Sequence, residues 1–420
     1  MNDILKAREW RSLLIKEMVA SSHHPVVLVK ANIPGSDKNK PLGYLVVNLF
    51  HKYLLDNYQI SKGQFYSSCD GPFYLVEIKG VSEQLKMELI KVEDNHPLGR
   101  LVDFDVYDKK GNVSRTHLKQ EPRKCLICNL PAHQCIRSKA HQLIEIEAKI
   151  DEITISYLKD EIKKIIDEAM TLEAKLDPKF GLVTYYSCGS HPDMNYHLME
   201  KSKEAILDNF VLMFETGYLL PLDDAFLKAR VIGVKSEELM FQATKGINTY
   251  KGLIFVLGFV LVALGYCLKN NKQDLFHQIK YLGRNLLDEF QTNDFNSFGL
   301  QAYSQYQFTG IRGEVYRRLP NVQKVLPLIT DYQESTLTLA LIELIRNVED
   351  TVLLKRAGSL ERYHYFRQLV GSIQEYDLKK INQITKECIK HNISFGGAAD
   401  LLVVAIFIRK VEEKFAIKYE

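Results

Sequence analysis

Two aspartates separated by one residue, Asp103 and Asp105, are the first pair whose types and spacing could do chemistry. They lie in the run L-V-D-F-D-V-Y (residues 101–107), whose alternation of apolar and polar side chains predicts a β-strand. Because successive side chains of a strand point to opposite faces, both carboxylates would share one face. Such a pair could hold Mg²⁺ against a triphosphate and help neutralise a leaving pyrophosphate, although the same pattern also occurs on exposed strands without a function.

Three cysteines and a histidine lie close together downstream of this strand. They are Cys125, Cys128, Cys135 and His141, with the spacing C-x2-C-x6-C-x5-H. Four such ligands could close a tetrahedral zinc site, and its role would be structural because no position stays open for a substrate. The alternative is that they are reduced thiols packed under a loop. Seven cysteines in all, an odd number, favour a reducing compartment over a disulfide framework.

Several polar motifs in the second half of the chain lie next to apolar helical patterns. Their acidic members are Asp193, Glu314, Asp350 and Asp400. Each alone would usually be a helix cap or a turn residue. Because charges beside apolar helices must be solvated or paired, we expect the four carboxylates to converge on a Mg²⁺-polyphosphate site. The basic residues expected to add positive charge there are Lys179, Lys251, Arg312 and Arg356.

The elements that position these residues change in type near residue 150. Up to residue 120, strand patterns (25–33, 73–78, 101–107 and 113–118) alternate with helical patterns (43–58 and 82–92), which predicts an α+β domain with a small mixed sheet. From residue 139 onward helical periodicity dominates. The expected helices cover 141–176, 192–215, 237–245, 253–268, 275–291, 334–354, 361–373, 378–391 and 398–415. We therefore predict two domains, 1–150 and 151–420, the second all-α, joined by a helix that is continuous near residues 147–157.

The composition is that of a globular protein and excludes several function classes. The 420 residues are 46% hydrophobic and 25% charged, with a net charge of +3, so no strong field for nucleic acid is expected. The first residues lack the apolar stretch of a secretory signal. The uncharged run 252–268 is slightly shorter than the roughly 20 residues that a spanning helix needs. We expect it to be a buried core helix in a cytoplasmic protein without membrane contact, and a membrane anchor is the alternative.

Several first-half motifs resemble, in order, those of the citrate lyase holo-acyl-carrier-protein synthase family (apo-citrate lyase phosphoribosyl-dephospho-CoA transferases). They are N-I-P-G (32–35), H-P-L-G-R-L-V-D-F-D-V (96–106), Ser114-Arg115 and the Cys/His cluster. The resemblance implies a nucleotidyltransferase-like domain that joins a phosphoribosyl-dephospho-CoA group to a serine of the citrate lyase acyl carrier protein and releases pyrophosphate. It also implies that Asp103 and Asp105 hold the metal. Phosphate contacts are then expected from Lys38, Arg100 and Arg115.

The second half resembles the triphosphoribosyl-dephospho-CoA synthase family. The matching motifs are P-K-F-G-L-V (178–183), G-S-H-P-D-M (189–194), G-I-N-T-Y-K-G (246–252), R-G-E (312–314), E-D-T (349–351) and S-F-G-G-A-A-D-L-L (394–402). The resemblance implies an all-α enzyme in which ATP gives its triphosphoribosyl group to the 2′-hydroxyl of 3′-dephospho-CoA and adenine leaves.

The synthase resemblance also carries over candidate residues. The catalytic ones are Asp193, Asp350, Glu314 and Asp400, of which we expect Asp193 and Asp350 to lie nearest the chemistry. The substrate-binding ones are Lys179, His191, Asn248, Lys251, Arg312, Arg356 and Ser394. The chain departs from the usual family residues at Phe180, Tyr250, Val352, Phe395 and Ala398.

Together the two resemblances predict the fused, bifunctional form of the citrate lyase prosthetic-group maturation enzyme. Its substrates and partners would be ATP, 3′-dephospho-CoA and the citrate lyase acyl carrier protein, with Mg²⁺ as cofactor and structural Zn²⁺ in the Cys/His cluster. Two alternatives remain: the same chemistry for the carrier protein of a related lyase or decarboxylase, such as malonate decarboxylase, and a non-catalytic, metal-stabilised binding protein.

Overall fold

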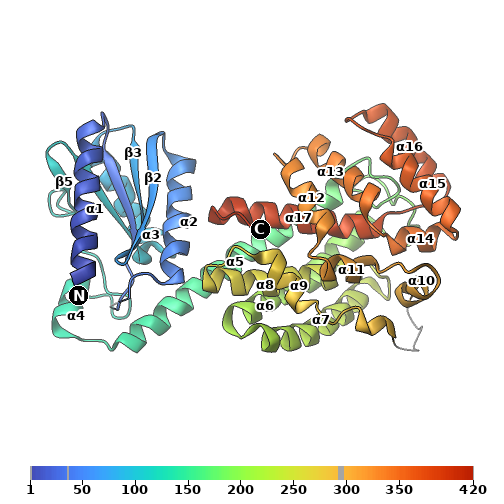
Figure 1. Ribbon diagram of the computed structural model, residues 1–420, viewed down its shortest axis with the longest axis horizontal. Helices are drawn as coiled ribbons and strands as arrows, with labels where there is room; N and C mark the ends of the chain where they lie inside the picture. The colour runs from blue at the N-terminus through green and yellow to red at the C-terminus, as the bar shows by residue number, and fades with distance from the viewer. Residues whose placement is uncertain (1, 36, 292–297, 420) are drawn as a thin grey trace. The chain divides into compact units, whose positions relative to one another are not determined.

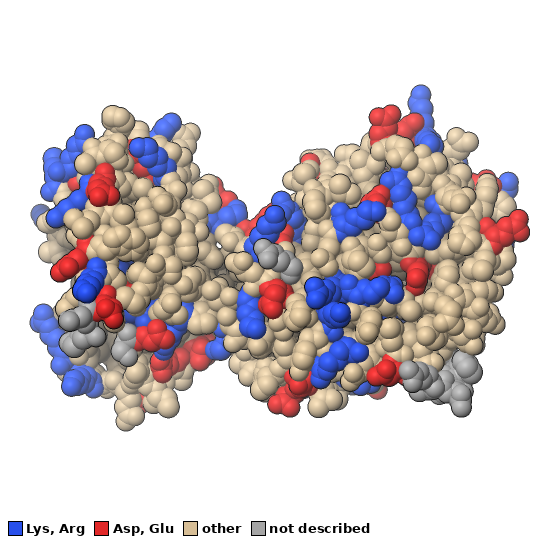
Figure 2. All heavy atoms as spheres, in the orientation of Figure 1, with Lys and Arg blue, Asp and Glu red and all other residues tan. Residues whose placement is uncertain are grey.

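The protein consists of two compact units in a computed structural model that describes residues 2–35, 37–291 and 298–419 (Figure 1). Unit 1 comprises Met1–Leu158, Leu268–Asn271 and Lys414–Ile417, and unit 2 comprises Lys159–Cys267, Lys272–Glu413 and Lys418–Glu420. Lys and Arg side chains lie among Asp and Glu side chains on the face of each unit that Figure 2 shows, in keeping with the small net charge.

Unit 1 is built around a five-stranded sheet with the order β2-β3-β1-β4-β5. The strands are β1 (Val26–Ala31), β2 (Ile60–Ser68), β3 (Gly71–Ile78), β4 (Val102–Asp108) and β5 (Gly111–Val113). The predicted α+β class is confirmed, but every strand pairing is antiparallel, so the sheet is not mixed. In the register of β1 and β4, Lys30 lies opposite Asp103 and Leu28 opposite Asp105, which places all four side chains on one face.

Helices cover both faces of this sheet. They are α1 (Asn2–Ser21), α2 (Pro41–Asn57) and α3 (Ser82–Asn95), with the short elements η1 (Gly99–Leu101) and α4 (Ala132–Ser138) at its margins. Ile15 of α1 packs with Val26 and Leu28 on the face that carries the aspartates. On the other face, the ring of Phe50 in α2 meets the ring of Phe104 edge-on at 5.7 Å. The aspartate pair therefore projects from the α1 side of the sheet, and the opposite side packs against α2.

Unit 2 is all-α over its described residues, as predicted. Its helices are α5 (Leu143–Lys175), α6 (Tyr196–Leu219), α7 (Leu222–Thr244), α8 (Lys251–Asn270), α9 (Leu275–Leu282), η2 (Asp288–Gln291), α10 (Phe298–Tyr306), α11 (Gly310–Tyr316), α12 (Pro320–Val325), η3 (Leu326–Leu328), α13 (Glu334–Asn347), α14 (Thr351–Ala357), α15 (Leu360–Gly371), α16 (Leu378–Lys390) and α17 (Gly396–Phe415). The first turns of α5 belong to unit 1 and the rest to unit 2, so the predicted continuous helix is confirmed.

Several helix boundaries differ from the prediction: the expected helix 237–245 is the end of α7, which starts at Leu222, and the expected helix 275–291 ends at Leu282 as α9. At two other boundaries, polar side chains cap new helices. The expected helix 334–354 is interrupted at residues 348–350, where the carboxylate of Asp350 accepts hydrogen bonds from the first N–H groups of α14. The expected helix 192–215 begins only at Tyr196, where Asn195 is the N-cap. Asp193 therefore lies in the turn before α6 and not in its first turn.

The uncharged run forms most of α8. Among the described residues this is the one helix long and apolar enough to cross a membrane, and 78% of the apolar window is buried inside the structure. A side chain at Gly265 would collide with the backbone of Phe214 in α6, so glycine is needed for the two helices to pack this closely. The prediction of a buried core helix is confirmed.

Candidate active sites

The two aspartates of β4 lie next to a lysine of β1. The Nζ atom of Lys30 is 3.0 Å from Oδ2 of Asp103 and 3.3 Å from Oδ2 of Asp105, and both aspartates remain about a quarter to a third exposed. Burial alone would raise the pKa of Asp103, but Lys30 and Arg123 outweigh it and lower that pKa. The same carboxylates raise the pKa of Lys30 against the effect of its own burial. This strand face thus keeps a carboxylate ionised and favours a cation.

A buried glutamate that the sequence did not single out organises the arginines around this pair. Glu93 of α3 is 1% exposed, and its two oxygens lie 2.6 Å from guanidinium nitrogens of Arg115 and Arg123. The backbone N–H of Phe104 also donates to Glu93 at 2.9 Å. Arg123 in turn lies 3.5 Å from Oδ1 of Asp103. Glu93 therefore fixes Arg123 against the aspartate pair.

The predicted phosphate contacts of unit 1 have different surroundings. Arg115 is already paired with Glu93 and Asp94. Nε and Nη1 of Arg100 are buried without a hydrogen-bond partner in the described part of the chain. Burial lowers the pKa of Arg100, and Arg123 and Arg115 lower it further. Burial likewise lowers the pKa of Lys38, which feels the charges of Arg8, Lys40 and Lys30. An anion near Arg100 would relieve this crowding of positive charge.

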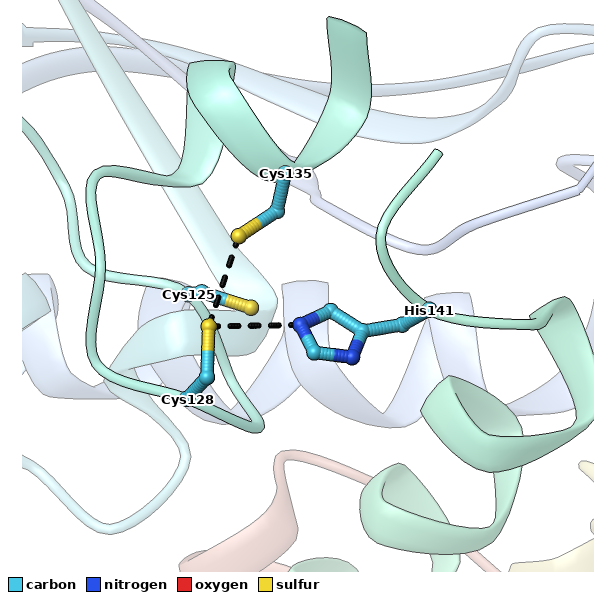
Figure 3. Close-up of side chains that lie close together, drawn as sticks. All are labelled: Cys125, Cys128, Cys135 and His141. Carbon is cyan, nitrogen blue, oxygen red and sulfur yellow. Dashed lines mark hydrogen bonds between the residues drawn. The ribbon is translucent and has the colours of Figure 1, made fainter. Parts of the chain in front are cut away.

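The three cysteines and the histidine come together as the spacing predicted (Figure 3). Their ligand atoms all lie within 4.8 Å of one another, with Sγ of Cys128 at 3.4 Å from Sγ of Cys135 and 3.3 Å from Nε2 of His141. Zinc bonds of about 2.0–2.3 Å would place tetrahedral ligands at similar separations, within about 4 Å. The backbone N–H of Ile127 donates to Sγ of Cys125. Burial raises the pKa of Cys125, but N–H donors such as this one outweigh burial and lower that pKa to about 7.

Local structure explains why these ligands meet. Lys124 pairs with Pro131 in an isolated β-bridge, and the N–H of Cys125 donates to the carbonyl of Leu130 at 2.6 Å. This tight loop brings Cys125 and Cys128 together, and α4 then places Cys135 above them. The donor set, the separations and the fold of the loop all fit a zinc ion.

Unit 2 contains a cavity of about 690 Å³ that gathers most of the predicted synthase residues. Those lining it are Lys179, His191, Asn248, Lys251, Arg356, Ser394 and Asp400. Asp350 lies directly behind the wall, since its carboxylate is about 3.1 Å from where a side chain on Gly397 would begin. The motifs lie far apart in sequence, yet the helix ends that carry them meet at this cavity.

One wall of the cavity is a loop, residues 176–195, held against residues 388–394. The hydroxyl of Ser190 donates to the carbonyl of Ile393 at 2.6 Å. Gly181 has a φ of +81° and lies so close to that carbonyl that any side chain would collide with it. Glycine at this position therefore allows the two segments to close together and form the wall.

His191 is hydrogen-bonded on both sides of its ring. Nδ1 lies 2.8 Å from Nη2 of Arg356, and Nε2 lies 2.8 Å from the hydroxyl of Ser394. Because arginine can only donate, Nδ1 is the acceptor and the ring proton is on Nε2. Burial and Arg356 lower the pKa of His191 to about 4. The ring is thus neutral near pH 7 and aligns Arg356 and Ser394 at the cavity wall.

The acidic groups at the cavity are of two kinds. Asp350 accepts N–H bonds from Val352, Leu353 and Ala398, so it caps α14 and also binds the first turn of α17. Asp400 has no hydrogen-bond partner among the described residues, and its Oδ2 packs against Gly252 at the start of α8. Burial raises the pKa of both, and Glu173 and Asp350 raise that of Asp400 further. Asp400 is therefore the carboxylate with oxygens still free for a ligand.

Two further residues at the cavity were not predicted as site residues. Glu173 of α5 is buried and forms a 2.8 Å ion pair with Lys179. The Tyr250 hydroxyl is buried without a partner in the described residues, and burial raises its pKa well above the ordinary value. Glu173 follows Ile166, Ala169 and Met170 on the buried stripe of α5, and an acid at an apolar position is the signal that could have found it.

Besides Asp350, three further predicted residues do not line this cavity. Burial lowers the pKa of His191 and Arg356, and Asp193 lies close enough to offset part of that lowering, but it is not part of the lining. Glu314 is buried and accepts from Asn321 at 2.6 Å. Arg312 lies over the rings of Phe255 and Phe290. The expected convergence of all four carboxylates is thus incomplete, because the segment with Glu314 and Arg312 turns them elsewhere.

The positions that depart from the synthase pattern fall into two groups, those that line the cavity and those packed around it. Tyr250 and Val352 line the cavity, and Phe180, Phe395 and Ala398 are buried in the packing around it.

A strand face with paired aspartates and crowded arginines, and a polar cavity between helix ends, define a two-unit transferase acting on phosphorylated substrates. Residues 1–157 match the family of apo-citrate lyase phosphoribosyl-dephospho-CoA transferases, and residues 159–419 match the family of ATP:dephospho-CoA triphosphoribosyl transferases.

Curated relatives combine both parts in the same order. The chain is 30% identical to protein CitXG of Leuconostoc mesenteroides over 97% of this chain and 96% of the relative, and 29% identical to protein CitXG of Haemophilus influenzae over 96% and 94%. It is 31% identical to the 2-(5''-triphosphoribosyl)-3'-dephosphocoenzyme-A synthase of Haemophilus ducreyi, over 67% of this chain and 98% of that enzyme.

The chain therefore belongs to the CitXG family of fused transferases. It is a bifunctional transferase of citrate lyase prosthetic-group synthesis, which confirms the predicted family and activities. The alternative of a non-catalytic binding protein is left without support.

Proposed function

We propose that the two activities are divided as the sequence predicted, with the carrier-modifying transferase in residues 1–150 and the synthase in residues 151–420. The division into compact units near Leu158 and the change of family near residue 158 support this assignment. The observation that carries the proposal is the 690 Å³ cavity, where residues from widely separated synthase motifs meet inside unit 2.

In the synthase reaction, the 2′-hydroxyl of 3′-dephospho-CoA attacks the anomeric carbon of the ATP ribose. The bond from that carbon to adenine breaks, the hydroxyl proton passes to a base, and adenine leaves with a proton on its nitrogen. Such displacements pass through an oxocarbenium-like state that a nearby carboxylate stabilises. Asp400 is our first candidate because its oxygens have no partner in the described chain, and its raised pKa suits a general base.

The other polar groups of the cavity bind and position substrate. Arg356, aligned by the neutral ring of His191, and Lys251, at the start of α8, supply positive charge for the triphosphate. Asp350 holds the first turns of α14 and α17 together by accepting N–H bonds from both, and residues of both helix ends line the cavity. Asp193, Asn248 and Ser394 remain proposed contacts. Glu314 and Arg312 would act from outside this cavity.

In the transferase reaction, the serine hydroxyl of the carrier protein attacks the phosphorus next to the ribose. A new P–O bond forms as the bond from that phosphorus to its bridging oxygen breaks. The serine proton passes to a base, and pyrophosphate leaves with the bridging oxygen. Asp103 and Asp105 would hold Mg²⁺, which supplies charge neutralisation for the leaving group. The ion pairs of Lys30 with the two carboxylates support this proposal, because they place a positive charge at the same point. Arg100, Arg115, Arg123 and Lys38 surround this point with further positive charge.

Binding of Mg²⁺ in unit 2 is also proposed, with Asp400 and Glu173 as the candidate ligands. Glu173 is already paired with Lys179, so the ion would share that carboxylate or replace the ammonium. Because hard cations prefer carboxylate and phosphate oxygens, a triphosphate would complete the coordination.

Zinc in the Cys/His cluster is a structural proposal. One Zn²⁺ held by Cys125, Cys128, Cys135 and His141 would fix the loop that begins at Arg123, and Arg123 contacts the aspartate pair. Metal analysis of the purified chain should find one zinc per molecule. Cys128→Ser should lose it, whereas Cys69→Ser, an exposed cysteine outside the cluster, should keep it. A zinc-free chain with full carrier transfer would support the reduced-thiol alternative.

The remaining partner and location assignments are also proposals. Mixed surface charge fits small phosphorylated substrates and a carrier protein better than nucleic acid (Figure 2). A buried α8 fits a soluble, cytoplasmic enzyme without membrane contact. Assays with purified carrier proteins should show preference for the citrate lyase carrier over that of malonate decarboxylase.

The division of labour can be tested with two variants of the full chain. The apo carrier protein is incubated with ATP, 3′-dephospho-CoA and Mg²⁺, and its mass is measured. Asp400→Asn should neither release adenine nor modify the carrier, whereas Asp103→Asn should release adenine without modifying it. A mixture of the two variants should restore modification, because free intermediate passes from one to the other. Unaltered adenine release by Asp400→Asn would remove that residue from the chemistry.

A further inference from the structure

A second cavity of about 210 Å³ lies in unit 2 between α7 and α8. Three phenylalanines form much of its wall: the ring centroid of Phe259 is 5.3 Å from that of Phe226 and 5.1 Å from that of Phe255. Met213 completes the apolar lining. Aromatic rings and a thioether make a wall suited to a slender apolar group.

Glycines open the space in front of Met213. A side chain on Gly258 of α8 would begin 3.1 Å from Sδ of Met213, and one on Gly233 of α7 would begin 3.7 Å from its Cε. Any larger residue at Gly258 would therefore press on Met213 and fill the cavity. The cavity opens to solvent at Arg230 and Val234, so a ligand can reach the aromatic rings.

Charged groups stand among the apolar ones. The guanidinium of Arg312 lies 5.5 Å from the ring centroid of Phe255, and that of Arg230 lies 5.8 Å from the ring centroid of Phe226. Glu237 also lines this cavity and forms a 2.7 Å ion pair with Lys251. No Asn, Gln, Ser or Thr is found among the described residues of the lining.

The second cavity adjoins the 690 Å³ cavity along α8. Lys251 lines the larger cavity, whereas Phe255 and Phe259, one and two turns further on, line the smaller. Positions four residues apart share a helix face. At 1.5 Å per residue, the two rings lie about 6 Å and 12 Å along the axis from Lys251. A second junction is at Ile311 and Arg312, consecutive residues that line one cavity each.

We propose that this second cavity binds the pantetheine arm of 3′-dephospho-CoA. The inference rests on the proposed synthase function of residues 151–420 and assigns the site of its acceptor substrate. The order of groups in that molecule is ribose, pyrophosphate and then arm. The order along the protein is matching: a polar cavity for the reacting hydroxyl, then the guanidinium groups of Arg312 and Arg230, then the aromatic wall.

The chemistry of the lining favours the arm over an adenine ring. Adenine is recognised by hydrogen bonds to its edge, and the described lining offers no amide or hydroxyl side chain for them. The arm carries a dimethyl group, methylene chains and a thiol, which gain free energy by leaving water for an apolar wall. Its hydroxyl and two amides would pair with the charged side chains of the lining, Arg230, Glu237 and Arg312. The site thus separates the acceptor from ATP, although both substrates contain adenosine.

A variant at the rim tests the proposal with a matched control. Val234 lines the cavity, yet 61% of its surface is exposed, so Val234→Trp can cover the opening without disturbing the core. Val231, on the same helix and 70% exposed, is not part of the lining, and Val231→Trp is the control. Adenine release is measured while ATP and 3′-dephospho-CoA are varied separately, and the melting temperature shows that each variant is folded.

Val234→Trp should raise the KM for 3′-dephospho-CoA by about tenfold, the loss expected when one or two methylenes lose their burial, and leave the KM for ATP unchanged. Calorimetry with pantetheine alone should show binding to the parent chain and to Val231→Trp, and at least tenfold weaker binding to Val234→Trp.

Three results would overturn the assignment. A rise in the KM for ATP alone would make the cavity an adenine site for the donor. Equal KM values for all three chains, or equal pantetheine binding, would leave the cavity without a role in acceptor binding. A parent chain that releases no adenine would contradict the proposed synthase function itself, and the calorimetry would still decide whether pantetheine binds here.

Discussion

In unit 1 the paired aspartates lie on a partly open strand face against Lys30 and Arg123. In unit 2 Asp350 is buried and Asp400 half-buried, and neither forms an ion pair with a basic side chain among the described residues. The difference appears in their pKa values. Basic neighbours lower the pKa of Asp103 against the effect of burial, while burial raises that of Asp350 and Asp400. The two halves thus hold carboxylates for related phosphate chemistry in opposite electrostatic states.

The two units differ in how their site residues affect the stability of the fold. The ion pairs of unit 1 contribute to folding, and a substrate-bound metal ion has to compete with an ammonium already in place. Unit 2 keeps carboxylates in a place that disfavours their charge, so its site lowers stability until a cation and substrate arrive. Sites of the second kind are usually stabilised when the functional group is removed.

The largest expected effect is on carrier modification by Asp103→Asn. If Asp103 is a metal ligand as proposed, its loss, worth several kcal/mol, should lower the transferase rate by about 10³-fold when the purified intermediate is supplied. The melting temperature of unit 1 should also fall, because Lys30 and Arg123 lose a partner. Adenine release, measured in the same sample, is the internal control and should not change. A variant that modifies the carrier at the parent rate would show that the strand pair is not the metal site.

Most of the fold could be predicted because its core follows simple periodicities. Strand β1 and helices α2, α5 and α17 were all recognisable from apolar spacing. Helix α1 was missed because Leu5 and Leu13 are exposed and blur its pattern, and β2 was missed because it is an edge strand rich in exposed polar residues. The break before α14 was missed because the apolar pattern continues on both sides of Asp350, so the sequence reads as one helix.

The site could be predicted only as far as its motifs extend. Order and residue type were enough to select His191, Arg356 and Asp400, which lie at one cavity. Glu93 and Glu173 lie outside the quoted motifs, and a buried glutamate on a helix resembles a solvent-exposed one until the packing is known. Arg312 lies in a motif, yet its helix directs it to the second cavity, which no linear pattern reveals.

The second expected effect concerns Asp400→Asn, and it tests the opposite electrostatic state of unit 2. Adenine release should fall by about 10²-fold, the scale of losing one acid–base group. The melting temperature should rise by a few degrees, because a neutral amide replaces a carboxylate whose charge is disfavoured by burial and by Glu173. An adenine assay measures the fall in activity, and calorimetric thermal unfolding measures the change in melting temperature. A lower melting temperature would mean that the charge of Asp400 stabilises the fold, and the comparison would then fail.

A smaller effect is expected from removal of the ammonium in unit 1. Lys30→Met keeps the length of the side chain but leaves Asp103 and Asp105 facing each other without a cation. Mg²⁺ then no longer competes with Lys30, so half-maximal carrier transfer should need about tenfold less Mg²⁺, equivalent to roughly 1.4 kcal/mol. Lys110→Met, on the exposed turn between β4 and β5, is the matched control. An increased Mg²⁺ requirement would indicate that Lys30 binds substrate phosphate instead.

The smallest effect is a difference in pH dependence. Because the pKa of Asp400 is raised, its charged form is lost at a higher pH than that of Asp103, whose pKa is lowered. On acidification from pH 8, adenine release should therefore decline before carrier transfer does, which changes the ratio of the two rates by a few-fold.

The two carboxylates should also affect the pH dependence of stability with opposite signs. Protonation of Asp400 relieves a buried charge, so the thermal gain of Asp400→Asn should shrink as pH falls through the raised pKa. Asp103 contributes stability above its ordinary pKa, and this contribution is lost toward lower pH. His191, with a pKa of about 4, adds no limb near neutrality, so an acid limb unchanged in Asp400→Asn would assign the titration to another group.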